Sequence, residues 1–430
     1  MPRVLLLATT TGYQTRAFGD AAGRLGVDLV FATDRCQVLD DPWRDGAIAI
    51  RFHDEVASVR KILAAGRARA IDGVLVVGDR PTVIGARVLE ALGLPGHSPS
   101  AAAIARNKER TRGRLLEAGL PAPWFTTTPI AADPARLATE VPFPCVIKPL
   151  ALSGSRGVMR ADDPEAFTAA FRRLRALLRS PELRAERTGA HERALIESFV
   201  SGREYAVEGL MHHGDLQVLA IFDKPDPLDG PFFEETIYVT PSAAPGEEQR
   251  AIREAVAAAA RAIGLSHGPV HAECRVSRTD GAGAPRVVVL EAAARPIGGL
   301  CARALEFVNA RGARIALEEL LLRHALGESP AGWTRAPGAS GVMMMPIPRR
   351  GIFRRASGID DARAVPGITD VRVTAKPDQR LVPLPEGASY LGFVFARAAS
   401  APATVEALRC AHARLRFDVD VEVPIVGTTA

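Results

Sequence analysis

Two glutamates stand near the ends of two apolar segments that follow each other in the sequence. Glu273 lies in Gly268-Pro-Val-His-Ala-Glu-Cys-Arg-Val, and Glu291 follows the apolar run at residues 287–290. The pattern predicts buried strands, and the polar turn at residues 280–283 predicts an antiparallel hairpin with both carboxylates side by side. Adjacent like charges need a cation between them, and Mg²⁺ takes one or two carboxylates together with water and phosphate oxygens. The pattern is compatible with a magnesium–phosphate site; the alternative, which this pattern alone leaves open, is that each glutamate separately faces solvent or an arginine.

A lysine ends another apolar segment, Pro144-Cys-Val-Ile-Lys148, and a loop with Ser153, Gly154, Ser155 and Gly157 follows it. An ammonium at the end of a buried strand is costly unless it meets an anion. Glycines and serines allow backbone N–H groups to close over phosphate oxygens. This is not a P-loop, since no Gly-Lys-Ser/Thr opens a helix. The segment indicates phosphate binding, with a flexible turn beside an edge lysine as the alternative.

The third segment is Ala194-Leu-Ile-Glu197-Ser-Phe-Val200-Ser-Gly-Arg-Glu204. A strand that turns into a second strand places Glu197, the Val200 backbone and Glu204 along one edge. A purine could bind backbone groups there, with a carboxylate on the ribose hydroxyls. The alternative is an ordinary hairpin.

In this order and spacing the segments resemble the ATP-grasp superfamily of carboxylate–amine ligases, over roughly residues 100–310. The matching pieces are Asn107-Lys108, Lys148-Pro with its Ser-Gly-Ser-Arg-Gly loop, Glu197-x-x-Val200 with Glu204, Glu273, and Glu291-x-x-x-Arg295-Pro-x-Gly-Gly. The resemblance implies ATP and Mg²⁺ as cofactors, with Mn²⁺ as a substitute for Mg²⁺. It implies small-molecule carboxylate and amine substrates, and it is compatible with a homodimer.

The resemblance also implies a role for each matching residue. Lys108 and Lys148 contact the ATP phosphates, and the loop with Ser153, Gly154, Ser155 and Gly157 closes over them. Glu197 and Val200 hold adenine, and Glu204 holds the ribose. Glu273 and Glu291 bind the metal. Many members carry an asparagine two residues after the second glutamate, where this chain has Ala293, so the number of metal ions stays open.

A closer resemblance connects the chain to the dipeptide-forming L-amino-acid ligases. It rests on Glu291-Ala-Ala-Ala-Arg295-Pro-Ile-Gly298-Gly299, on Glu234-Glu235-Thr-Ile-Tyr238, and on the last domain with Tyr390-Leu-Gly-Phe. It implies that Arg295 binds the acyl phosphate or the substrate carboxyl group, and that the Glu-Thr loop lines the amine pocket. Tyr238 stands where those ligases carry a histidine, so the choice of substrate does not transfer. The expected substrate residues are Glu235, Tyr238, His271, Arg295, Gly298 and Gly299.

The implied reaction is the phosphorylation of a carboxylate by ATP, followed by attack of an amine and release of ADP and phosphate. Phosphoryl transfer needs positioning and charge neutralisation, which Lys148 and Arg295 supply as the catalytic residues. Glu235 and His271 are candidate bases for the amine. Two alternatives stay open: a carboxylase that uses bicarbonate, although no biotin-carrier lysine motif is present, and a nucleotide-binding protein without catalysis.

The elements that must position these residues suggest an α/β and α+β multidomain protein. Strands and helices alternate over residues 1–100, which predicts a parallel sheet with crossover helices. Thr9-Thr-Thr-Gly-Tyr follows the first strand in place of Gly-x-Gly-x-x-Gly, so a redox dinucleotide fold is not expected, although this turn could bind a small substrate.

We expect an ATP-grasp fold with a Rossmann-like N-terminal domain (1–105), a small subdomain with the Gly/Ser-rich loop (106–202), a large subdomain with the Mg–ATP site (203–330) and a C-terminal α+β domain (340–430). Residues 301–326 are expected to form one or two helices and residues 328–339 a linker. The last domain is expected to hold strands at 341–346, 371–375, 390–396 and 417–423.

Composition excludes several other classes. The chain is 47% hydrophobic and 24% charged, and its formal charge of +5 is small for 430 residues. The arginines are scattered without interleaved aromatic residues, so no nucleic-acid partner is expected. The five cysteines are far apart, without zinc-like spacing. No apolar run approaches a membrane span and no signal-peptide pattern is present, so we expect a cytoplasmic protein without a membrane partner. His212 and His213 are expected on an exposed turn without a metal role.

Overall fold

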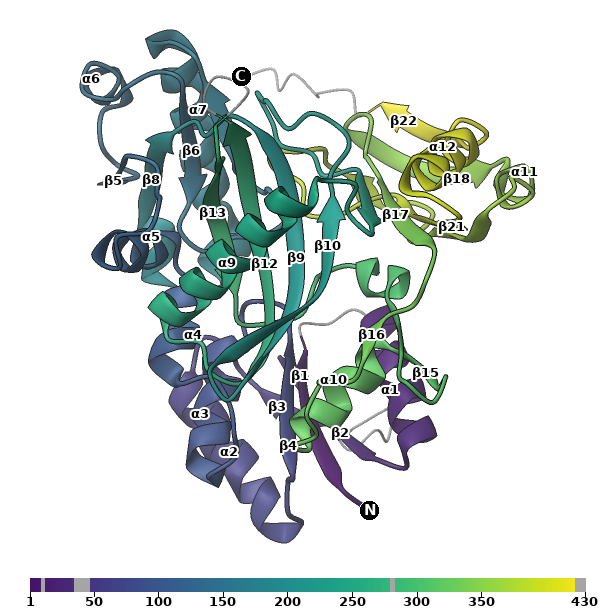
Figure 1. Ribbon diagram of the computed structural model, residues 1–430. Helices are drawn as coiled ribbons and strands as arrows, with labels where there is room; N and C mark the ends of the chain where they lie inside the picture. The colour runs from purple at the N-terminus through teal and green to yellow at the C-terminus, as the bar shows by residue number, and fades with distance from the viewer. Residues whose placement is uncertain (9–11, 35–46, 279–282, 422–430) are drawn as a thin grey trace.

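The computed structural model describes residues 1–8, 12–34, 47–278 and 283–421. Parts of three sequence-based predictions lie outside these ranges: residues 9–11 of the turn after the first strand, the hairpin turn up to residue 282, and residues 422–423 of the last expected strand. In Figure 1 the N-terminal part lies at the bottom, the central sheet in the middle and the C-terminal part at the upper right.

A four-stranded parallel sheet forms the N-terminal part, which confirms the prediction from alternating strands and helices. Its order is β3-β2-β1-β4. Val4, Leu5, Leu6 and Leu7 are fully buried, as expected for a parallel strand covered on both faces. Its elements are β1 (Arg3–Ala8), α1 (Gly12–Leu25), β2 (Asp28–Asp34), β3 (Ile48–Ile50), α2 (Glu55–Ala68), β4 (Gly73–Val77) and α3 (Thr82–Leu92).

Two helices lead from this sheet to the next part of the chain, α4 (Pro99–Ala105) and α5 (Lys108–Glu117). The side chain of Asn107 caps α5 by accepting the N–H of Arg110 at 3.1 Å, as its position predicts. The cap fixes the start of α5, and Lys108 is its first residue.

A small antiparallel sheet of order β5-β8-β6-β7 follows. Helix α7 covers it with Phe167, Phe171, Leu174 and Leu178, which recur at helical spacing and are buried. The elements are β5 (Phe125–Pro129), α6 (Pro134–Leu137), β6 (Cys145–Pro149), β7 (Met159–Ala161), α7 (Pro164–Leu178), α8 (Pro181–Arg184), the 3₁₀ turn Gly189–Glu192 and β8 (Arg193–Ser198).

An eight-stranded sheet of order β13-β12-β9-β10-β11-β17-β21-β19 forms the centre of the molecule. One face packs on helix α9 through residues such as Tyr205, Cys274 and Val289. Side chains alternate along a strand, so Glu204, Glu273 and Arg275 lie on the other face. The elements are β9 (Arg203–His212), β10 (Asp215–Asp223), β11 (Ile237–Thr240), α9 (Gly246–Ile263), β12 (Gly268–Arg278) and β13 (Pro285–Ala293).

The C-terminal strands β17, β19 and β21 continue this central sheet, because β17 pairs with β11 and with β21. The expected strands of the C-terminal region are present, yet most of them add to the sheet of the preceding part. A second sheet of order β20-β18-β22 lies beside them. The elements are β17 (Ala339–Met345), β18 (Gly351–Ser357), α11 (Ile359–Arg363), β19 (Ile368–Val373), β20 (Arg380–Leu381), β21 (Gly392–Ala398), α12 (Ala401–His412) and β22 (Arg416–Val421).

Two predictions near residues 300–340 are wrong. Residues 301–326 are not one or two helices throughout, because a 3₁₀ turn (Cys301–Ala304), β14 (Glu306–Val308) and β15 (Arg314–Ala316) precede helix α10 (Leu317–Ala325). The expected linker contains β16 (Thr334–Arg335), which pairs with β14. Strands of two or three residues are too short to show a periodic pattern, so their pairing was not visible in the sequence.

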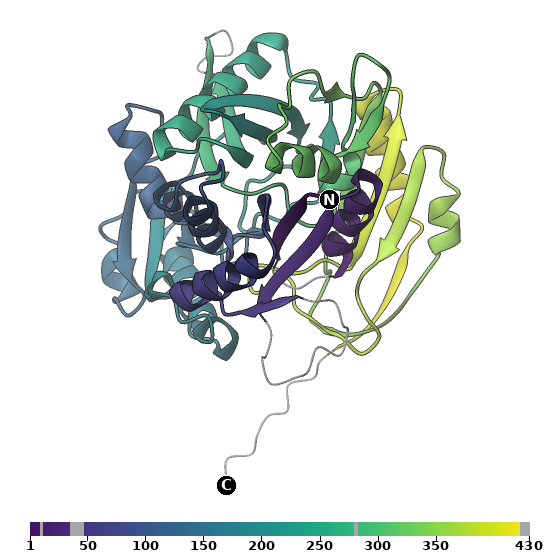
Figure 2. The ribbon, with the colours of Figure 1, turned by 90° about the horizontal axis from the view of Figure 1, so that it is seen from below.

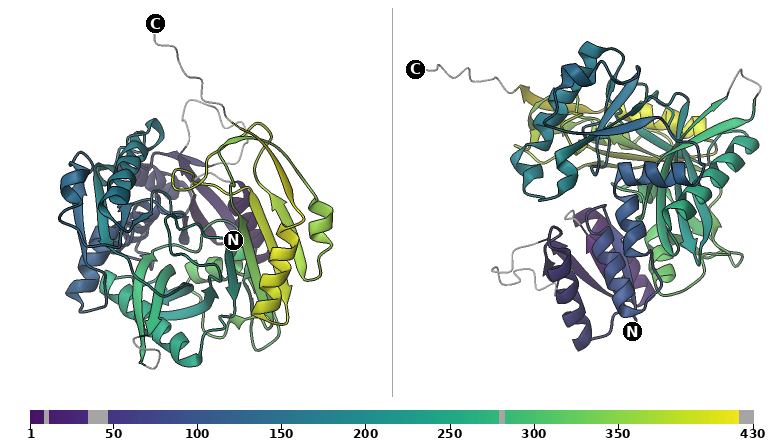
Figure 3. Two further views of the ribbon diagram at one scale, coloured as in Figure 1. Left: turned by 90° about the horizontal axis from the view of Figure 1, so that it is seen from above. Right: turned by 90° about the vertical axis from the view of Figure 1, so that its left-hand side faces the viewer.

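The molecule has four parts: the N-terminal sheet, the small sheet, the central sheet and the C-terminal part. Seen from below, the N-terminal sheet lies in front of the other parts (Figure 2). Seen from above, the small sheet and the C-terminal part lie on opposite sides of the molecule (Figure 3). None of the helices in the described ranges combines the length and hydropathy of a membrane-spanning segment.

Candidate functional site

A cavity of about 760 Å³ lies where the four parts meet. Its walls come from the carboxyl end of β4, the loop after β6, the open face of the central sheet and the C-terminal segment around Tyr390. Every site residue that the sequence predicts lines this cavity except Gly157: Lys108, Lys148, Ser153, Gly154, Ser155, Glu197, Val200, Glu204, Glu235, Tyr238, His271, Glu273, Glu291, Arg295, Gly298 and Gly299.

The predicted hairpin is confirmed, and it places Glu273 of β12 opposite Glu291 of β13. The ladder is irregular next to this pair, because Cys274 pairs with Val289 and Leu290 is the extra residue. The carbonyl of Leu290 accepts a hydrogen bond from Arg112 Nη1 at 2.9 Å. Both glutamates line the cavity that also holds Lys148.

Lys224 directly follows β10 and lies among three carboxylates. Its Nζ donates to Glu204 Oε1 at 2.8 Å and to Glu235 Oε1 at 2.7 Å. A third bond reaches Glu273 Oε1 at 2.6 Å, and the ring of Tyr238 lies 4.9 Å from the ammonium. Burial alone would lower the pKa of Lys224, but the three carboxylates hold that pKa well above its usual value.

The carboxyl groups around Lys224 differ in the direction of their pKa shifts. Burial, followed by the neighbouring charge of Glu273, raises the pKa of Glu235 to about 8. Burial opposes ionisation of Glu273 as well, but Lys224 outweighs it and holds the pKa of Glu273 below its usual value. Glu273 is therefore the carboxylate of this pair that stays charged.

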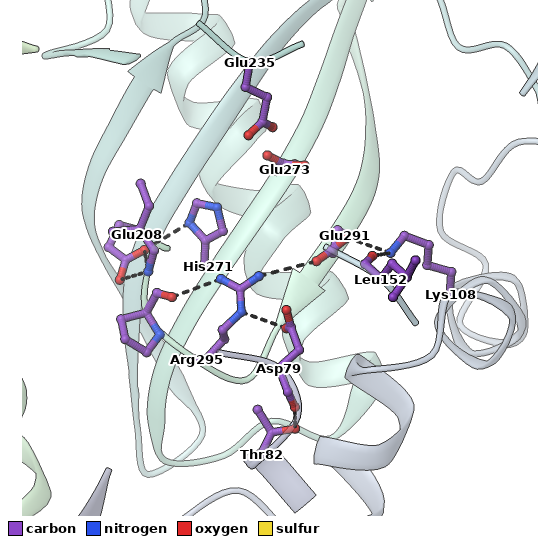
Figure 4. A network of polar contacts seen from close by, with 12 residues as sticks. Asp79, Thr82, Lys108, Leu152, Glu208, Glu235, His271, Glu273, Glu291 and Arg295 are labelled. Atoms are coloured by element: carbon purple, nitrogen blue, oxygen red, sulfur yellow. Dashed lines mark hydrogen bonds and ion pairs between the residues drawn. The ribbon is translucent and has the colours of Figure 1, made fainter. Parts of the chain in front are cut away.

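Glu291 contacts a different set of cations at the other side of the cavity. Its Oε2 lies 3.2 Å from Lys108 Nζ, and its Oε1 lies 3.9 Å from Arg295 Nη2. Arg295 Nε donates to Asp79 Oδ1 at 2.7 Å, and Asp79 follows β4 of the N-terminal sheet. Figure 4 shows Arg295 between Asp79 and Glu291, with Glu235 and Glu273 farther along the sheet.

A buried chain of charges connects α5 to β6. Arg112, fully buried, donates to Glu197 Oε2 at 3.0 Å, and Glu197 also pairs with Lys148. Burial and the nearby charge of Arg112 lower the pKa of Lys148 to about 8, although Glu197 acts in the opposite direction. The carboxylate of Glu197 is thus committed to two cations, and its contact with Lys148 sets where the ammonium points.

The predicted purine edge is also part of a charged network. Arg275 Nη1 donates to the carbonyl of Val200 at 2.8 Å, and Arg275 Nε donates to Glu204 Oε2 at 2.9 Å. The ring of Phe199 lies 5.0 Å from the guanidinium of Arg275. Arg275 and Lys224 therefore hold both oxygens of Glu204.

The loop after β6 lies over the cavity and contacts the C-terminal segment. Ser155 and Gly154 adopt positive φ values of 55° and 63°. The N–H of Gly157 donates to the carbonyl of Pro385 at 2.7 Å, and a side chain at Gly157 would approach Leu174 to 3.1 Å. Gly157 therefore serves the packing of the loop, which explains why it does not line the cavity.

His271 lies on the cavity face of β12, two residues before Glu273. Its Nδ1 lies 3.1 Å from Glu208 Oε2, and the N–H of Ile297 donates to both oxygens of Glu208, at 3.2 and 3.1 Å. Complete burial raises the pKa of Glu208. Glu208 thus fixes the orientation of the imidazole ring toward the cavity.

The end of the cavity beside Lys224 has an apolar and aromatic wall, and Tyr238 of this wall donates to Glu273 Oε1 at 3.1 Å. Gly298 and Gly299 lie there, and Gln14 Nε2 donates to the carbonyl of Gly299 at 2.5 Å. The apolar and aromatic lining is formed by Tyr238, Ile297, Cys301, Met344, Tyr390 and Phe393. This end suits the side chain of a small organic substrate.

The oxygen groups of the cavity fit a magnesium ion. Oxygens of Glu204, Glu235 and Glu273 lie within 4.8 Å of one another, and Glu291 stands opposite Glu273. Carboxylate oxygens are the ligands that Mg²⁺ prefers, and phosphate oxygens complete its shell. Lys224 now lies among the three clustered carboxylates, so it must yield part of these contacts when a metal ion binds.

Sequence reasoning missed Lys224, Asp79, Glu208, Arg275 and Arg112. Lys224 ends an apolar strand as Lys148 does, and Asp79 follows a parallel strand at its carboxyl end, where ligands bind in such sheets. Glu208 lies on the same face of β9 as Glu204, and Arg275 lies on the same face of β12 as Glu273. These signals were available, whereas nothing in a helical Arg-rich segment distinguishes Arg112 from its neighbours.

Comparison with known proteins agrees with this geometry. Family models match an ATP-grasp domain at residues 141–304, an ATP-grasp N-terminal domain at residues 19–96 and an L-amino acid ligase C-terminal domain 2 at residues 343–420. D-alanine–D-alanine ligase B of Chromobacterium violaceum is 30% identical over 254 residues, which cover 57% of this chain and 75% of that protein. The chain belongs to the ATP-grasp ligases.

Other relatives of this ATP-grasp ligase point the same way. The crystal structure of an L-amino acid ligase from Bacillus licheniformis superimposes with a TM-score of 0.81 at 26% identity, covering 97% of this chain and 99% of that one. An alanine–anticapsin ligase of Bacillus subtilis is 28% identical over 262 residues, 57% of this chain. The chain spans 53% of the length of that ligase. The protein is an ADP-forming enzyme that makes a carbon–nitrogen bond with ATP and a divalent metal ion.

Proposed function

We propose that this ligase joins the carboxylate of one amino acid to the amino group of a second amino acid or another amine, through an acyl phosphate. One observation carries the proposal: a single cavity combines the cations Lys108, Lys148 and Arg295 with a carboxylate cluster and an apolar and aromatic wall. The L-amino acid ligase with the same fold over nearly its whole length supports the substrate class.

The nucleotide end of the cavity is built from Lys108, Lys148 and the Ser153–Ser155 loop. Lys108 Nζ already donates to the carbonyl of Leu152 at 2.7 Å, so the lysine and the loop close over the phosphates together. Glu197 positions Lys148 by its ion pair, and the Val200 backbone lies beside it for adenine. Glu204 is the candidate for the ribose hydroxyls, once Lys224 or Arg275 releases one oxygen.

Glu273 and Glu291 would hold Mg²⁺, with Glu204 and Glu235 close by. The bound ion neutralises phosphate charge during phosphoryl transfer. Arg295 lies where it can bind the substrate carboxylate and then stabilise the oxyanion that forms when the amine attacks. Asp79 keeps Arg295 in this orientation.

The amine must arrive without its extra proton or lose it in the cavity. His271, oriented by Glu208, is the stronger candidate base because its ring lines the cavity and is fixed by a hydrogen bond. Glu235 accepts a hydrogen bond from the buried ammonium of Lys224 at 2.7 Å, which competes with an incoming amine. It is therefore a poorer base for the amine.

A test measures ADP release with a pool of L-amino acids in place of a known substrate, followed by mass spectrometry of the products. The proposal predicts ADP release only when carboxylate and amine are both present, and a new amide mass. ADP release with bicarbonate alone would instead indicate a carboxylase. ATP binding without ADP release under any condition would indicate a non-catalytic binding protein. Glu291→Gln should abolish turnover and leave the fold intact.

Three further properties belong to the proposal. Mn²⁺ should replace Mg²⁺, because both ions accept carboxylate and phosphate oxygens. We also propose that the enzyme acts in the cytoplasm, where ATP is abundant, and that it needs neither nucleic acid nor a membrane. A homodimer is the oligomeric state we propose to test first.

A further inference from the structure

Four histidines from three separate segments lie together at the end of the central sheet opposite the cavity. His212 is the last residue of β9 and His213 forms the following turn. His267 precedes β12, and His324 lies in the last turn of α10. His271, which lines the cavity, lies four residues after His267, roughly 13 Å away at the usual rise of a strand. None of the four lines the cavity.

The ring nitrogens of three of them converge. His212 Nδ1 lies 3.3 Å from His324 Nε2, and one nitrogen from each of His212, His267 and His324 lies within 4.8 Å of the other two. The rings of His267 and His324 are stacked, with centroids 4.2 Å apart. Nitrogens bound to one tetrahedral zinc ion lie about 3.3 Å apart, so the observed spacing is close to a ligand set.

The imidazole of His267 has an unsatisfied nitrogen. Only 7% of His267 and 2% of His324 is exposed, yet Nδ1 of His267 has no hydrogen-bond partner among the described residues. His97, on the other side of the same loop, shows the contrast: its Nδ1 accepts the N–H of Ser266 at 3.1 Å and its Nε2 lies 3.1 Å from the carbonyl of Pro269. A buried polar atom without a partner is costly and points to a ligand.

We propose that His212, His267 and His324 bind one zinc-class divalent cation. Imidazole nitrogen suits Zn²⁺ and its neighbours in the first transition row, whereas Mg²⁺ prefers oxygen. Three protein ligands leave a fourth position for water or for His213, which is exposed beside His212. To bind the ion, one ring of the stacked pair turns out of the stack.

The site would have a structural role. His212 ends β9 of the central sheet, His267 directly precedes β12, and α10 packs against both β12 and the N-terminal elements β4 and α1. A bound ion would thus link the sheet that holds the carboxylates to the helix that contacts the N-terminal part. This revises the expectation that His212 lies on an exposed turn without a metal role.

The test titrates chelator-treated protein with Zn²⁺ and without nucleotide or substrate. Excess Mg²⁺ is present so that it fills the oxygen sites of the cavity. The proposal predicts one Zn²⁺ per chain, and binding weaker by at least about tenfold in His267→Gln and in His324→Gln. His53→Gln is the matched control, since His53 is exposed and lies outside the cluster. Co²⁺ should give visible absorption bands in the wild type and in the control only.

Thermal unfolding gives a second readout: Zn²⁺ should raise the Tm of the wild type and of His53→Gln but not of the two variants. If His267→Gln does not fold, His212→Gln serves instead, because His212 is only half-buried. Equal Zn²⁺ affinity in all the proteins, or no binding in the micromolar range, would overturn the proposal. Neither result depends on ligase activity, so the proposed function would be unaffected.

Discussion

At the scale of single residues, Lys224 is expected to affect both the stability of the protein and its metal binding. Its ammonium is buried and bonds Glu204, Glu235 and Glu273. These carboxylates include a proposed metal ligand and the proposed ribose contact. We therefore propose that Lys224 balances the charge of these carboxylates until nucleotide and Mg²⁺ bind.

Replacing Lys224 by methionine should destabilise the protein by about 3 kcal/mol, because the carboxylates lose their buried counter-charge. Mg²⁺ without nucleotide should restore part of this loss in Lys224→Met and have little effect on the wild type. Urea unfolding with and without Mg²⁺ measures both quantities. An equal response of the two proteins to Mg²⁺ would show that Lys224 does not occupy the metal-binding region.

Lys148 leads to a prediction about pH. Its pKa of about 8 is below the usual value, so in the empty enzyme the ammonium loses its proton as pH rises through about 8. Binding of a phosphate-bearing nucleotide should then weaken between pH 7 and 9, up to about tenfold at one unit above the pKa. Lys148→Arg keeps its charge over this range, so its affinity for a non-hydrolysable ATP analogue should depend much less on pH. Parallel slopes in calorimetric titrations of the two proteins would contradict the assignment.

Among the elements, the loop after β6 and the C-terminal segment act as one closure. Arg156 Nε donates to the carbonyl of Glu386 at 2.9 Å, and Arg173 Nη2 donates to the carboxylate of Glu386 at 2.9 Å. With the bond from Gly157 to Pro385, the Arg156 contact holds the loop, and the Arg173 contact holds helix α7, against a segment more than two hundred residues later in the chain. We propose that the closed loop excludes water from the acyl phosphate.

Loosening this contact should uncouple ATP use from product formation. Glu386→Ala removes the ion pair that ties the C-terminal segment to Arg173 of α7 and keeps the backbone carbonyl that Arg156 bonds. The ratio of ADP released to amide formed should then rise about several-fold, because water reaches the acyl phosphate more often. The matched control is Glu140→Ala, which removes an exposed ion pair with Arg136 outside the cavity. A ratio that stays at the wild-type value in Glu386→Ala would contradict a role of the C-terminal segment in loop closure.

The helices and strands could be predicted from the sequence more accurately than the pairing of the strands and the contacts of the side chains. Glu273 and Glu291 could be placed side by side because a hairpin pairs residues that are close in sequence. The contact of Glu273 with Lys224 could not be predicted, because it depends on the register of β9, β10 and β12. Similarly, apolar alternation identified β17 and β21 as strands, but alternation carries no information about which sheet edge they join.

For the whole molecule, the cavity depends on how the N-terminal sheet meets the central sheet. Asp79 and Gln14 come from the N-terminal part and bond Arg295 and the carbonyl of Gly299, respectively. The motifs that carry the resemblance lie between residues 107 and 299 and in the last domain around Tyr390, so contacts from the first domain were outside its reach. These contacts show that the first domain forms part of the cavity wall, at the end where we propose that the substrate binds.

Asp79→Asn keeps the shape of this contact but removes the charge that orients Arg295. We expect kcat for amide formation to fall by about tenfold or more while the KM for ATP stays near the wild-type value, since Arg295 acts on the carboxylate and not on the nucleotide. Asp79→Glu should recover part of the activity. A change confined to the KM for ATP would place Asp79 at the nucleotide instead.

The central claim is that this cavity activates a carboxylate by transferring a phosphoryl group from ATP. The most direct measurement incubates the enzyme with ATP, Mg²⁺ and a mixture of L-amino acids labelled with ¹⁸O in their carboxyl groups, and then analyses the released phosphate by mass spectrometry. An acyl phosphate transfers one labelled oxygen to phosphate for each amide formed. Amide formation with unlabelled phosphate would contradict the account.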